Sequence, residues 1–321
     1  MRLLPLILIA FASSLASSVL LAQNREVLAE YKIGIVGQDR EDALYQAAHL
    51  GAKDAAYDLS KRYSIDVELI ILTPDKENGG SQTNSLGQLF IEDADGFILS
   101  PSTDESLLPA LEFAQTQNQQ IVLFESDIAD FNPLATVLAD DFLAGKMAAE
   151  SLIKEIPSGA RVAILSSNER TPVMEARLKG ARQALGYRRI ETVALSEPNY
   201  KAAIETLNKS MDADRNDYIS GWLLLGDWPL LGMPALPWRA GELPCVAIQS
   251  SPSAFIYIDQ GYLDALVVHP YYDWGYSSVS ILIDQLFKET GPEITKQVTA
   301  PELIDWDNVE AYREKWKLWM R

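Results

Sequence analysis

The stretch Lys32-Ile-Gly-Ile-Val-Gly37 decides the fold of this chain. It is short and almost continuously apolar, which is typical of a strand buried on both faces. A stretch of helical period follows it, from about Glu41 to Arg62. A buried strand followed by such a helix begins a βαβ unit, in which helices cover both faces of a parallel sheet. The fold therefore depends on whether this unit repeats.

The unit repeats in two runs along the chain. Further strands are expected at 65–72, 96–100, 120–125, 135–139, 161–166, 190–195, 218–226, 246–249 and 266–269. Helices are expected near 82–92, 104–118, 140–155, 171–185, 200–211 and 274–289. A last extended piece near 302–304 precedes Asp307-Asn308, which predicts an N-cap for a closing helix to Trp319. The sequence predicts an α/β protein of two doubly wound parallel-sheet lobes.

Composition agrees with this interpretation and excludes several classes of protein. The 321 residues are 48% hydrophobic and 22% charged, which is ordinary for a folded globular protein and long enough for two domains. The formal net charge of -18 repels phosphate backbones and anionic lipids, so nucleic acid and membrane surfaces are not expected partners. Only the N-terminal segment has the length of a membrane span.

The sequence contains no motif that is typical of a catalytic, metal or cofactor site. One cysteine, Cys245, and two histidines exclude an intramolecular disulfide and a zinc site of the usual kind. There is no G-x-S-x-G, H-E-x-x-H, phosphate-binding or dinucleotide-binding motif. His49 and His269 have no catalytic partner recognisable by spacing. We therefore expect no enzyme activity, no metal and no cofactor.

The first 22 residues predict an export signal. Met1-Arg2 gives a short positive start, and an uncharged run rich in Leu, Ile and Ala follows as far as Ala22. An uncleaved membrane anchor is the alternative, because the run is about as long as the roughly 20 residues that span a bilayer. Either way the folded part is expected outside the cytoplasm, most simply in the periplasm of a Gram-negative-type bacterium.

The ends of the predicted strands are rich in hydrogen-bonding and aromatic residues. In open α/β sheets, ligands bind outside the carboxyl ends of the strands. Planar acceptors and donors suit hydroxyl groups, and rings suit C–H faces. The placement of these residues as a set indicates a polyhydroxylated ligand, although each residue alone could belong to an ordinary polar loop.

Seven segments occur in an order that resembles a known family. They are Tyr31–Val36 with Asp42-Ala-Leu-Tyr45 and Gly51-Ala52, Gly96–Pro101, Asp140-Asp141 with Gly145-Lys146, Ala176–Gly180, Gly226-Asp227 with Gly232, His269-Pro270 with Gly275, and Asp307–Trp316. The order resembles the type I periplasmic binding proteins of the ribose-binding, sugar-transport group. This resemblance implies two lobes joined by a three-segment hinge, with the ligand bound between them. The lobes are expected over 25–139 with 270–299 and over 140–269 with 300–321.

The resemblance also implies a set of ligand-binding residues. They are Asp42, Tyr45, Glu125, Ser126, Arg177, Tyr200, Asp227, Gln249 and His269. Arg177 is expected to donate to hydroxyls or a carboxylate, Asp227 to accept from hydroxyls, and the two tyrosines to stack on the ligand.

The sequence departs from the family pattern at several of these positions. The usual Asp-Arg is Glu125-Ser126, the later Asp is Gln249, and the hinge Gln is His269. Ribose does not follow as the ligand. If Asp42, Glu125, Asp127 and Asp227 all line one cleft, the cleft is acidic and favours polyols or aminated ligands over sugar acids and phosphates.

The resemblance implies that ligand closes the lobes and that an ABC permease receives it. A sensor that presents the closed form to a membrane histidine kinase or chemoreceptor is the alternative, since the same fold serves both. A transcription regulator of the related repressor type is excluded, because the export signal occupies the place of its DNA-binding segment.

Overall fold

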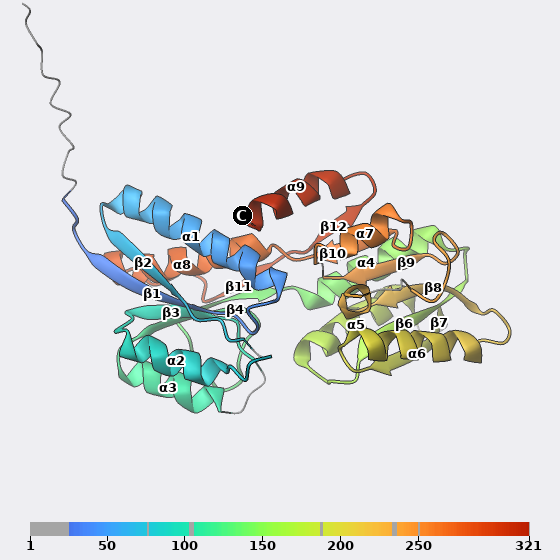
Figure 1. Ribbon diagram of the computed structural model, residues 1–321, viewed down its shortest axis with the longest axis horizontal. Coiled ribbons are helices and arrows are strands. Elements are labelled where there is room, and N and C mark those ends of the chain that lie inside the picture. The colour runs from blue at the N-terminus through green and yellow to red at the C-terminus, as the bar shows by residue number, and fades with distance from the viewer. Residues whose placement is uncertain are drawn as a thin grey trace, which may run out of the picture.

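The computed structural model describes residues 26–75, 77–102, 106–186, 189–232, 236–249 and 251–320. The predicted export signal at 1–22 lies outside the described residues. Figure 1 shows two lobes side by side along the long axis, each a sheet flanked by helices. This confirms the predicted class of two doubly wound lobes. In the described chain, no helix is both long enough and apolar enough to traverse a bilayer.

The first lobe is built on a parallel sheet. In spatial order its strands are β11 (Lys296–Thr299), β5 (Ala135–Ala139), β4 (Gln120–Glu125), β3 (Gly96–Leu99), β1 (Glu30–Val36) and β2 (Asp66–Ile71). All neighbouring strands run parallel. Helices α1 (Ala43–Tyr63) and α8 (Tyr271–Lys288) cover one face, and α2 (Gln82–Ile91) and α3 (Leu107–Thr116) cover the other (Figure 1). The central strand β3 is buried along its whole length because helices cover both faces of the sheet.

The second lobe repeats this arrangement. Its strands are β12 (Glu302–Asp305), β10 (Ala265–Val268), β9 (Cys245–Ile248), β8 (Ile219–Leu224), β6 (Arg161–Ser167) and β7 (Ile190–Ser196). Its helices are α4 (Asp141–Glu155), α5 (Pro172–Leu185), α6 (Tyr200–Ala213) and α7 (Ala254–Asp259). Matching the two spatial orders makes β4 equivalent to β9, and β3 equivalent to β8. A residue at one strand end therefore has a counterpart in the other lobe.

Two elements were not expected from the sequence, strand β11 and helix α7. The extended piece predicted at 302–304 is strand β12, which runs antiparallel to β10. The closing helix α9 (Val309–Trp319) begins after Asn308, as predicted. The Asn308 side chain does not cap it, however, but bonds to the backbone of Leu303 and Asp305, both at 2.9 Å.

Glycines bring helices α1 and α8 into backbone contact. A Cβ atom on Gly275 of α8 would lie 1.8 Å from the carbonyl oxygen of Ala48. A Cβ atom on Gly51 of α1 would lie 2.0 Å from the carbonyl oxygen of Tyr272. Only glycine fits at such a distance, so Gly51 and Gly275 determine where these helices cross.

Helices α4 and α5 of the second lobe cross in the same way. A Cβ atom on Gly145 would lie 1.9 Å from the carbonyl oxygen of Arg177, and one on Gly180 would lie 1.9 Å from that of Phe142. This crossing holds the first turns of α4 against the middle of α5, where Arg177 lies.

Three chain segments cross between the sheets. They connect β5 to α4, β10 to α8, and β11 to β12. The first and third crossings are joined where Asp140 N–H donates to Thr299 O at 3.2 Å. Trp274 Nε1–H donates to Thr299 Oγ1 at 2.9 Å, which ties the start of α8 to the same point. These crossings form the three-segment hinge that the resemblance implied.

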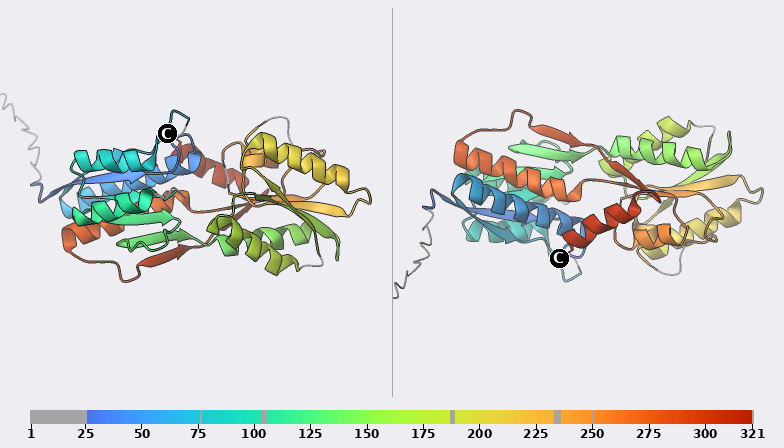
Figure 2. Two further views of the ribbon diagram at one scale, coloured as in Figure 1. Left: turned by 90° about the horizontal axis from the view of Figure 1, so that it is seen from below. Right: turned by 90° about the horizontal axis from the view of Figure 1, so that it is seen from above.

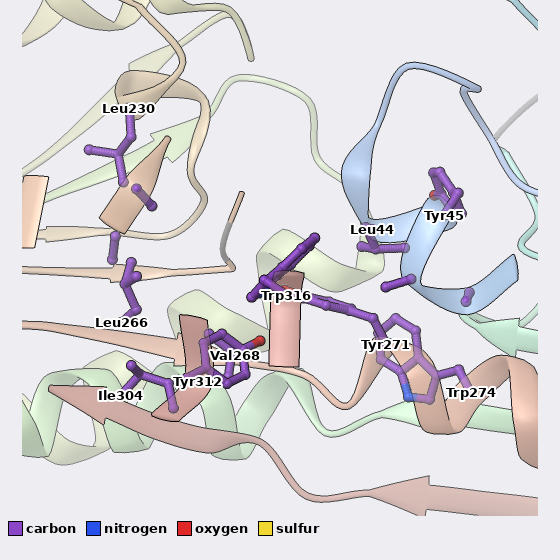
Figure 3. Packing of buried hydrophobic residues seen from close by; sticks show 14 of the residues in the cluster. Leu44, Tyr45, Leu230, Leu266, Val268, Tyr271, Trp274, Ile304, Tyr312 and Trp316 are labelled. Atoms are coloured by element: carbon purple, nitrogen blue, oxygen red, sulfur yellow. The ribbon is translucent and has the colours of Figure 1, made fainter. Parts of the chain in front are cut away.

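Helix α9 packs across the junction of the lobes. Figure 2 shows it alongside the inner end of α1, although it follows a strand of the second sheet. Trp316 lies 6.4 Å from Phe255 of α7 and 6.0 Å from Tyr271 of α8, between ring centroids, and Figure 3 shows it beside Tyr271. Trp319 stacks on Tyr272 at 6.2 Å. The hinge is thus flanked by an aromatic cluster with members from both lobes.

Candidate functional site

Most of the candidate residues lie at the carboxyl ends of the strands, where the two sheets approach the hinge. From the first lobe come Asp42 and Tyr45 at the start of α1, and Glu125 and Ser126 at the end of β4. From the second come Arg177 in α5 and Tyr200 at the start of α6. Asp227 lies in the loop that follows β8, and Gln249 and His269 directly follow β9 and β10. The parallel strands place these side chains at one edge of each sheet.

Glu125 is the centre of a hydrogen-bond network in the first lobe. Its Oε2 accepts from Tyr45 Oη at 2.9 Å and from the Ser100 hydroxyl. Gln38 Nε2 donates to Ser100 Oγ at 3.3 Å, which extends the network to the end of β1. Burial raises the pKa of Glu125, the two hydrogen bonds oppose that rise, and the negative charges of Asp42 and Asp141 add to it.

Glu125 adopts a strained backbone conformation. Its φ is 69°, and Ser126 N–H donates to Phe124 O at 2.8 Å across it. This is a γ-turn of the rare form with positive φ. Gln249, at the equivalent strand end of the other lobe, has a φ of 76°. Left-handed non-glycine residues of this kind concentrate at functional sites, where surrounding structure holds the strain.

A buried ion pair organises the second lobe. Arg177 Nε–H donates to Asp141 Oδ1 at 2.7 Å, and its Nη1 donates to Leu225 O at 2.9 Å. Arg177 is only 4% exposed. Burial alone would raise the pKa of Asp141, but the Arg177 guanidinium and His269 hold it below its ordinary value. Arg177 thus ties α4 to the end of β8. The ligand contact that the resemblance implies for Arg177 stays a prediction.

His269 follows β10 and lies at the hinge. Its ring is 2% exposed and lies 5.6 Å from the Trp274 ring, between centroids. Its Nε2 is 3.5 Å from Asp141 Oδ1, at the limit of a hydrogen bond, and its Nδ1 has no partner among the described residues. Burial lowers the pKa of His269, and its contact with Asp141 opposes this effect.

The aromatic candidates are packed more closely than predicted. Tyr45 is 3% exposed, and its ring covers Gly37, where a Cβ atom would lie 2.6 Å from it. Tyr45 thus supports Glu125 through its hydroxyl and does not offer a free stacking face. The half-buried Tyr200 ring lies against Gly232 in the same manner, and Trp228 covers Gly226. The indole of Trp228 donates to Ser196 Oγ at 3.2 Å.

Asp227 is half-buried and lies close to the opposite lobe. Burial raises the pKa of its carboxyl to about 6, and the charge of Asp42 on α1 adds to the rise. A hydrogen bond from Ser251 and the charge of Arg177 oppose it. Asp42 of the first lobe thus lies close enough to Asp227 of the second for the two charges to interact.

The raised pKa of Asp227 predicts how the stability of the protein depends on pH. Because the folded pKa exceeds the unfolded value of about 3.9, the free energy of unfolding falls as pH rises from about 4 to about 6. Asp227→Asn removes this dependence, and we expect it to be more stable than the wild type by up to about 3 kcal/mol at neutral pH. Urea unfolding at about pH 4 and about pH 7 measures both effects. Equal stability of variant and wild type at neutral pH would show that the carboxyl is solvated.

Two other acidic or titratable residues lie away from this site. Asp127 Oδ2 pairs with Lys296 Nζ at 2.6 Å, and Lys296 balances its charge. Asp127 is therefore not part of the acidic cleft for which the sequence analysis considered it. His49 Nε2 bonds to Thr73 Oγ1 at 2.9 Å, and burial lowers the pKa of His49 to about 4. No cluster of His, Cys, Asp or Glu with metal-ligand geometry occurs among the described residues.

Sequence reasoning missed three residues that organise the site. Ser100 and Gln38 lay in strand ends recognised as polar, but nothing in the sequence indicated that they bond to each other and to Glu125. Gln82 is 4% exposed, and its amide bonds to the backbone of Gly37, Ser100 and Ser102. A glutamine at the start of a helix gives no signal of such a role.

Solved structures share this architecture over most of the chain. A periplasmic ribose ABC transporter protein from Conexibacter woesei has a TM-score of 0.76 at 17% identity, covering 90% of this chain and 96% of its own. A periplasmic solute-binding protein from Actinobacillus succinogenes with bound D-allose has a TM-score of 0.73 at 18% identity, covering 88% and 100%. The Caulobacter myo-inositol binding protein has a TM-score of 0.70 at 18% identity, covering 87% and 96%. At these identities the likeness establishes the fold.

The family itself is established by sequence. A comparison with curated proteins finds no match for the chain. Residues 33–290, which include strands of both sheets, match the family model described as a periplasmic binding protein domain. This agrees with the resemblance drawn from the seven segments, and it identifies a class of proteins that bind solutes and do not transform them. The chain belongs to the periplasmic binding protein family.

Proposed function

We propose that this chain is an exported solute-binding protein that closes its two lobes on a small sugar or polyol-like ligand and delivers it to an ABC permease. The observation that carries the proposal is the facing of two polar strand-end networks, one in each lobe, on either side of a hinge. Neither network alone surrounds a ligand. Only closure brings both into contact with it.

In this proposal the ligand is bound by several of the predicted residues, which come from both lobes. Glu125, Asp227 and Gln249 accept hydrogen bonds from hydroxyls, while Ser126 and Gln249 also donate. Asp42 and His269 border the same region. Arg177 and Tyr45 hold their neighbours in place, and Tyr200 lies at the margin. A ligand that contacts both lobes only when they close stabilises the closed form by its differential affinity.

The ligand class is supported by proteins of the same fold. The solved structures named above are described as a ribose ABC transporter protein, a solute-binding protein with D-allose and a myo-inositol binding protein. Ligands in this set are neutral and rich in hydroxyl groups. The same descriptions favour delivery to a permease over the alternative of a sensor that reports to a membrane kinase or chemoreceptor.

The proposal includes the organisation of the chain. Residues 1–22 are the export signal, and the protein acts in the periplasm of a Gram-negative-type bacterium. The lobes comprise 25–139 with 270–299, and 140–269 with 300–321. Sheet membership supports this division, since β11 joins the first sheet and β12 the second. Helix α9 is shared, because it packs on both lobes.

A thermal-shift screen tests the proposed function. The purified protein is heated with pentoses, hexoses, polyols and amino sugars, each at high concentration. A ligand at about 100 times its Kd adds about 2.7 kcal/mol to the free energy of unfolding and raises the Tm by several degrees. Small-angle scattering of the same complex should show a smaller radius of gyration, since the lobes close.

Two results would contradict the proposed function. One is that no hydroxylated compound of any charge raises the Tm. The other is chemical change of the bound compound, which recovery of the ligand after incubation would detect. Glu125→Ala should abolish the shift, whereas Asp127→Asn should preserve it, because Asp127 pairs with Lys296 away from the network.

A further inference from the structure

Strand β7 forms an open edge of the second sheet. Its seven residues, Ile190–Ser196, pair in parallel with β6, and no other described strand pairs with them. An edge strand leaves part of its backbone N–H and C=O groups without a partner in the sheet, and a further strand can bind to them. Proteins usually block such edges, often with charged side chains.

The corresponding edge of the first sheet is blocked by charge, whereas that of the second is not. Matching the spatial orders of the strands makes β2 equivalent to β7. Strand β2 carries two exposed carboxylates, Asp66 and Glu68. In β7, Glu191 is paired with Arg161 at 2.7 Å, and residues 192–196 carry no charge. Most of the outer edge of β7 is therefore open to another strand.

A groove with a volume of about 1080 Å³ lies beside this edge and is lined by residues of β7 and α5. In the first lobe α1 packs against β2, whereas α5 packs mainly against α4, which leaves this space open. The apolar side chains that line the groove are Phe142, Met174, Leu178, Val193 and Leu195. Leu195 is 55% exposed. Apolar surface gathered in a groove of this kind is typical of an interaction site.

The charges around the groove have the opposite balance to the chain as a whole. Its charged lining residues are Arg170, Lys179, Arg182, Glu169 and Glu175, so cations are in the majority. All five are exposed. In the whole chain, by contrast, 45 acidic residues outnumber 27 basic ones. Among oppositely charged partners, the groove therefore favours an acidic one.

The two kinds of lining residue lie at different ends of the groove. In a βαβ unit the helix runs back along its strands, so the start of α5 lies near the end of β7. Met174 and Leu195 thus form an apolar end, and Lys179 and Arg182, which share one side of α5, form a cationic end. A strand added beside β7 would turn every second side chain towards α5.

We propose that β7 and this groove bind an extended, acidic segment of a partner protein, which adds to the second sheet as a further strand. Its apolar side chains fill the end at Met174 and Leu195, and its carboxylates meet Lys179 and Arg182. A second copy of this chain fits less well. Antiparallel pairing of β7 with β7 would place both copies of these two cations on one face of the joined sheet, where they repel. None of the candidate solute-binding residues lines the groove.

Selection of peptides on the purified protein tests the proposal. A displayed library of random octapeptides is enriched for binding at low ionic strength, and the best sequences are synthesised. We expect them to combine Asp or Glu with β-branched or aromatic residues and to lack Lys, Arg and Pro. The best should bind with a Kd of about 100 μM or tighter, and more weakly in about 0.5 M salt, which screens the charges. No enrichment, or enrichment of basic peptides, overturns the proposal.

Two double variants locate the binding site. Lys179→Glu with Arg182→Glu reverses the charge of the groove and should weaken binding of the peptides about 10-fold or more. Lys201→Glu with Lys209→Glu makes the same change of charge on α6, where both lysines are exposed, and should leave the affinity unchanged. Equal effects of the two double variants would mean that the peptides respond to overall charge, and the groove would not be their site.

Methylation of the peptide backbone tests whether the peptide binds as a strand. Methyl groups on one alternate set of amide nitrogens should abolish binding, because those N–H groups bond to β7, whereas methyl groups on the other set should be tolerated. Equal tolerance of both sets overturns strand addition.

Cosedimentation with phosphatidylglycerol vesicles tests an anionic membrane as the partner. We expect no binding, because the chain as a whole repels anionic lipids. If the vesicles bind more tightly than every peptide, and Lys179→Glu with Arg182→Glu abolishes that binding, the partner is a membrane and the proposal is wrong.

Discussion

Gly275→Ala should be among the most destabilising single substitutions in this protein. The added methyl group would lie 1.8 Å from the carbonyl oxygen of Ala48 and 3.0 Å from the backbone nitrogen of Ala52. Both neighbours are helix backbone, so neither can rotate away, and α8 must separate from α1. We expect a loss of about 3 kcal/mol, the upper part of the range for overpacked cores. Urea unfolding of the purified variant measures it.

Gly87→Ala is the matched control. Gly87 lies within α2 of the same lobe, and a Cβ atom there would meet nothing within 4 Å. Because alanine is the better helix former, we expect a gain of about 0.5 to 1 kcal/mol. The same chemical change should therefore have opposite signs at the two positions. If Gly275→Ala unfolds at the wild-type urea concentration, α1 and α8 do not cross at backbone contact.

The fold could be predicted from the sequence because its core strands carry a strong local signal. Strands such as β3, with the sequence Gly96-Phe-Ile-Leu99, are buried at every position, so an uninterrupted apolar run marks them. Strand β11 gives no such signal. It is an edge strand whose residues alternate between exposed and half-buried, and its Lys296 and Gln297 are polar. Its place in the sheet is decided by pairing with β5, far away in sequence.

The location of the candidate site could be predicted, whereas the roles of its residues could not. Strand ends follow from strand positions, and the resemblance then pointed to Glu125 and Asp227 among the polar residues there; their contact with a ligand stays a prediction. The bonding of Arg177 depends on Gly145 and Gly180, which let α4 and α5 approach until Asp141 meets the guanidinium. Local sequence contains no information on such a contact, which arises from helix crossing. The burial of Tyr45 over Gly37 has the same origin.

Arg177→Met is the second substitution for which we expect a large effect. The change keeps most of the side-chain volume but leaves the charge of Asp141, which is 8% exposed, without its partner. Leu225 O also loses a donor. Breaking one side of a buried pair in this way destabilises proteins by about 3 to 5 kcal/mol. Ligand affinity should fall as well, since α4 and the end of β8 are no longer held together.

The pH dependence distinguishes this mechanism from a simple packing defect. In the wild type the pKa of Asp141 is held low, so the stability from the pair is present above the unfolded pKa and is lost as pH falls through the folded one. Without Arg177, burial dominates and raises the pKa of Asp141. Acid then protonates the carboxyl, which removes the buried charge and the loss of stability that it causes in the variant. The difference in unfolding free energy should thus be largest near neutral pH and narrow toward about pH 4.

Two further variants complete the test. Arg161→Met removes an arginine that contacts Glu191 at the same 2.7 Å but is half exposed, so it should have little measurable effect. Arg177→Met combined with Asp141→Leu removes both charges and should recover much of the lost stability, because an apolar pair tolerates burial. If the double variant is as unstable as Arg177→Met, the loss comes from packing against β8 and not from an uncompensated charge.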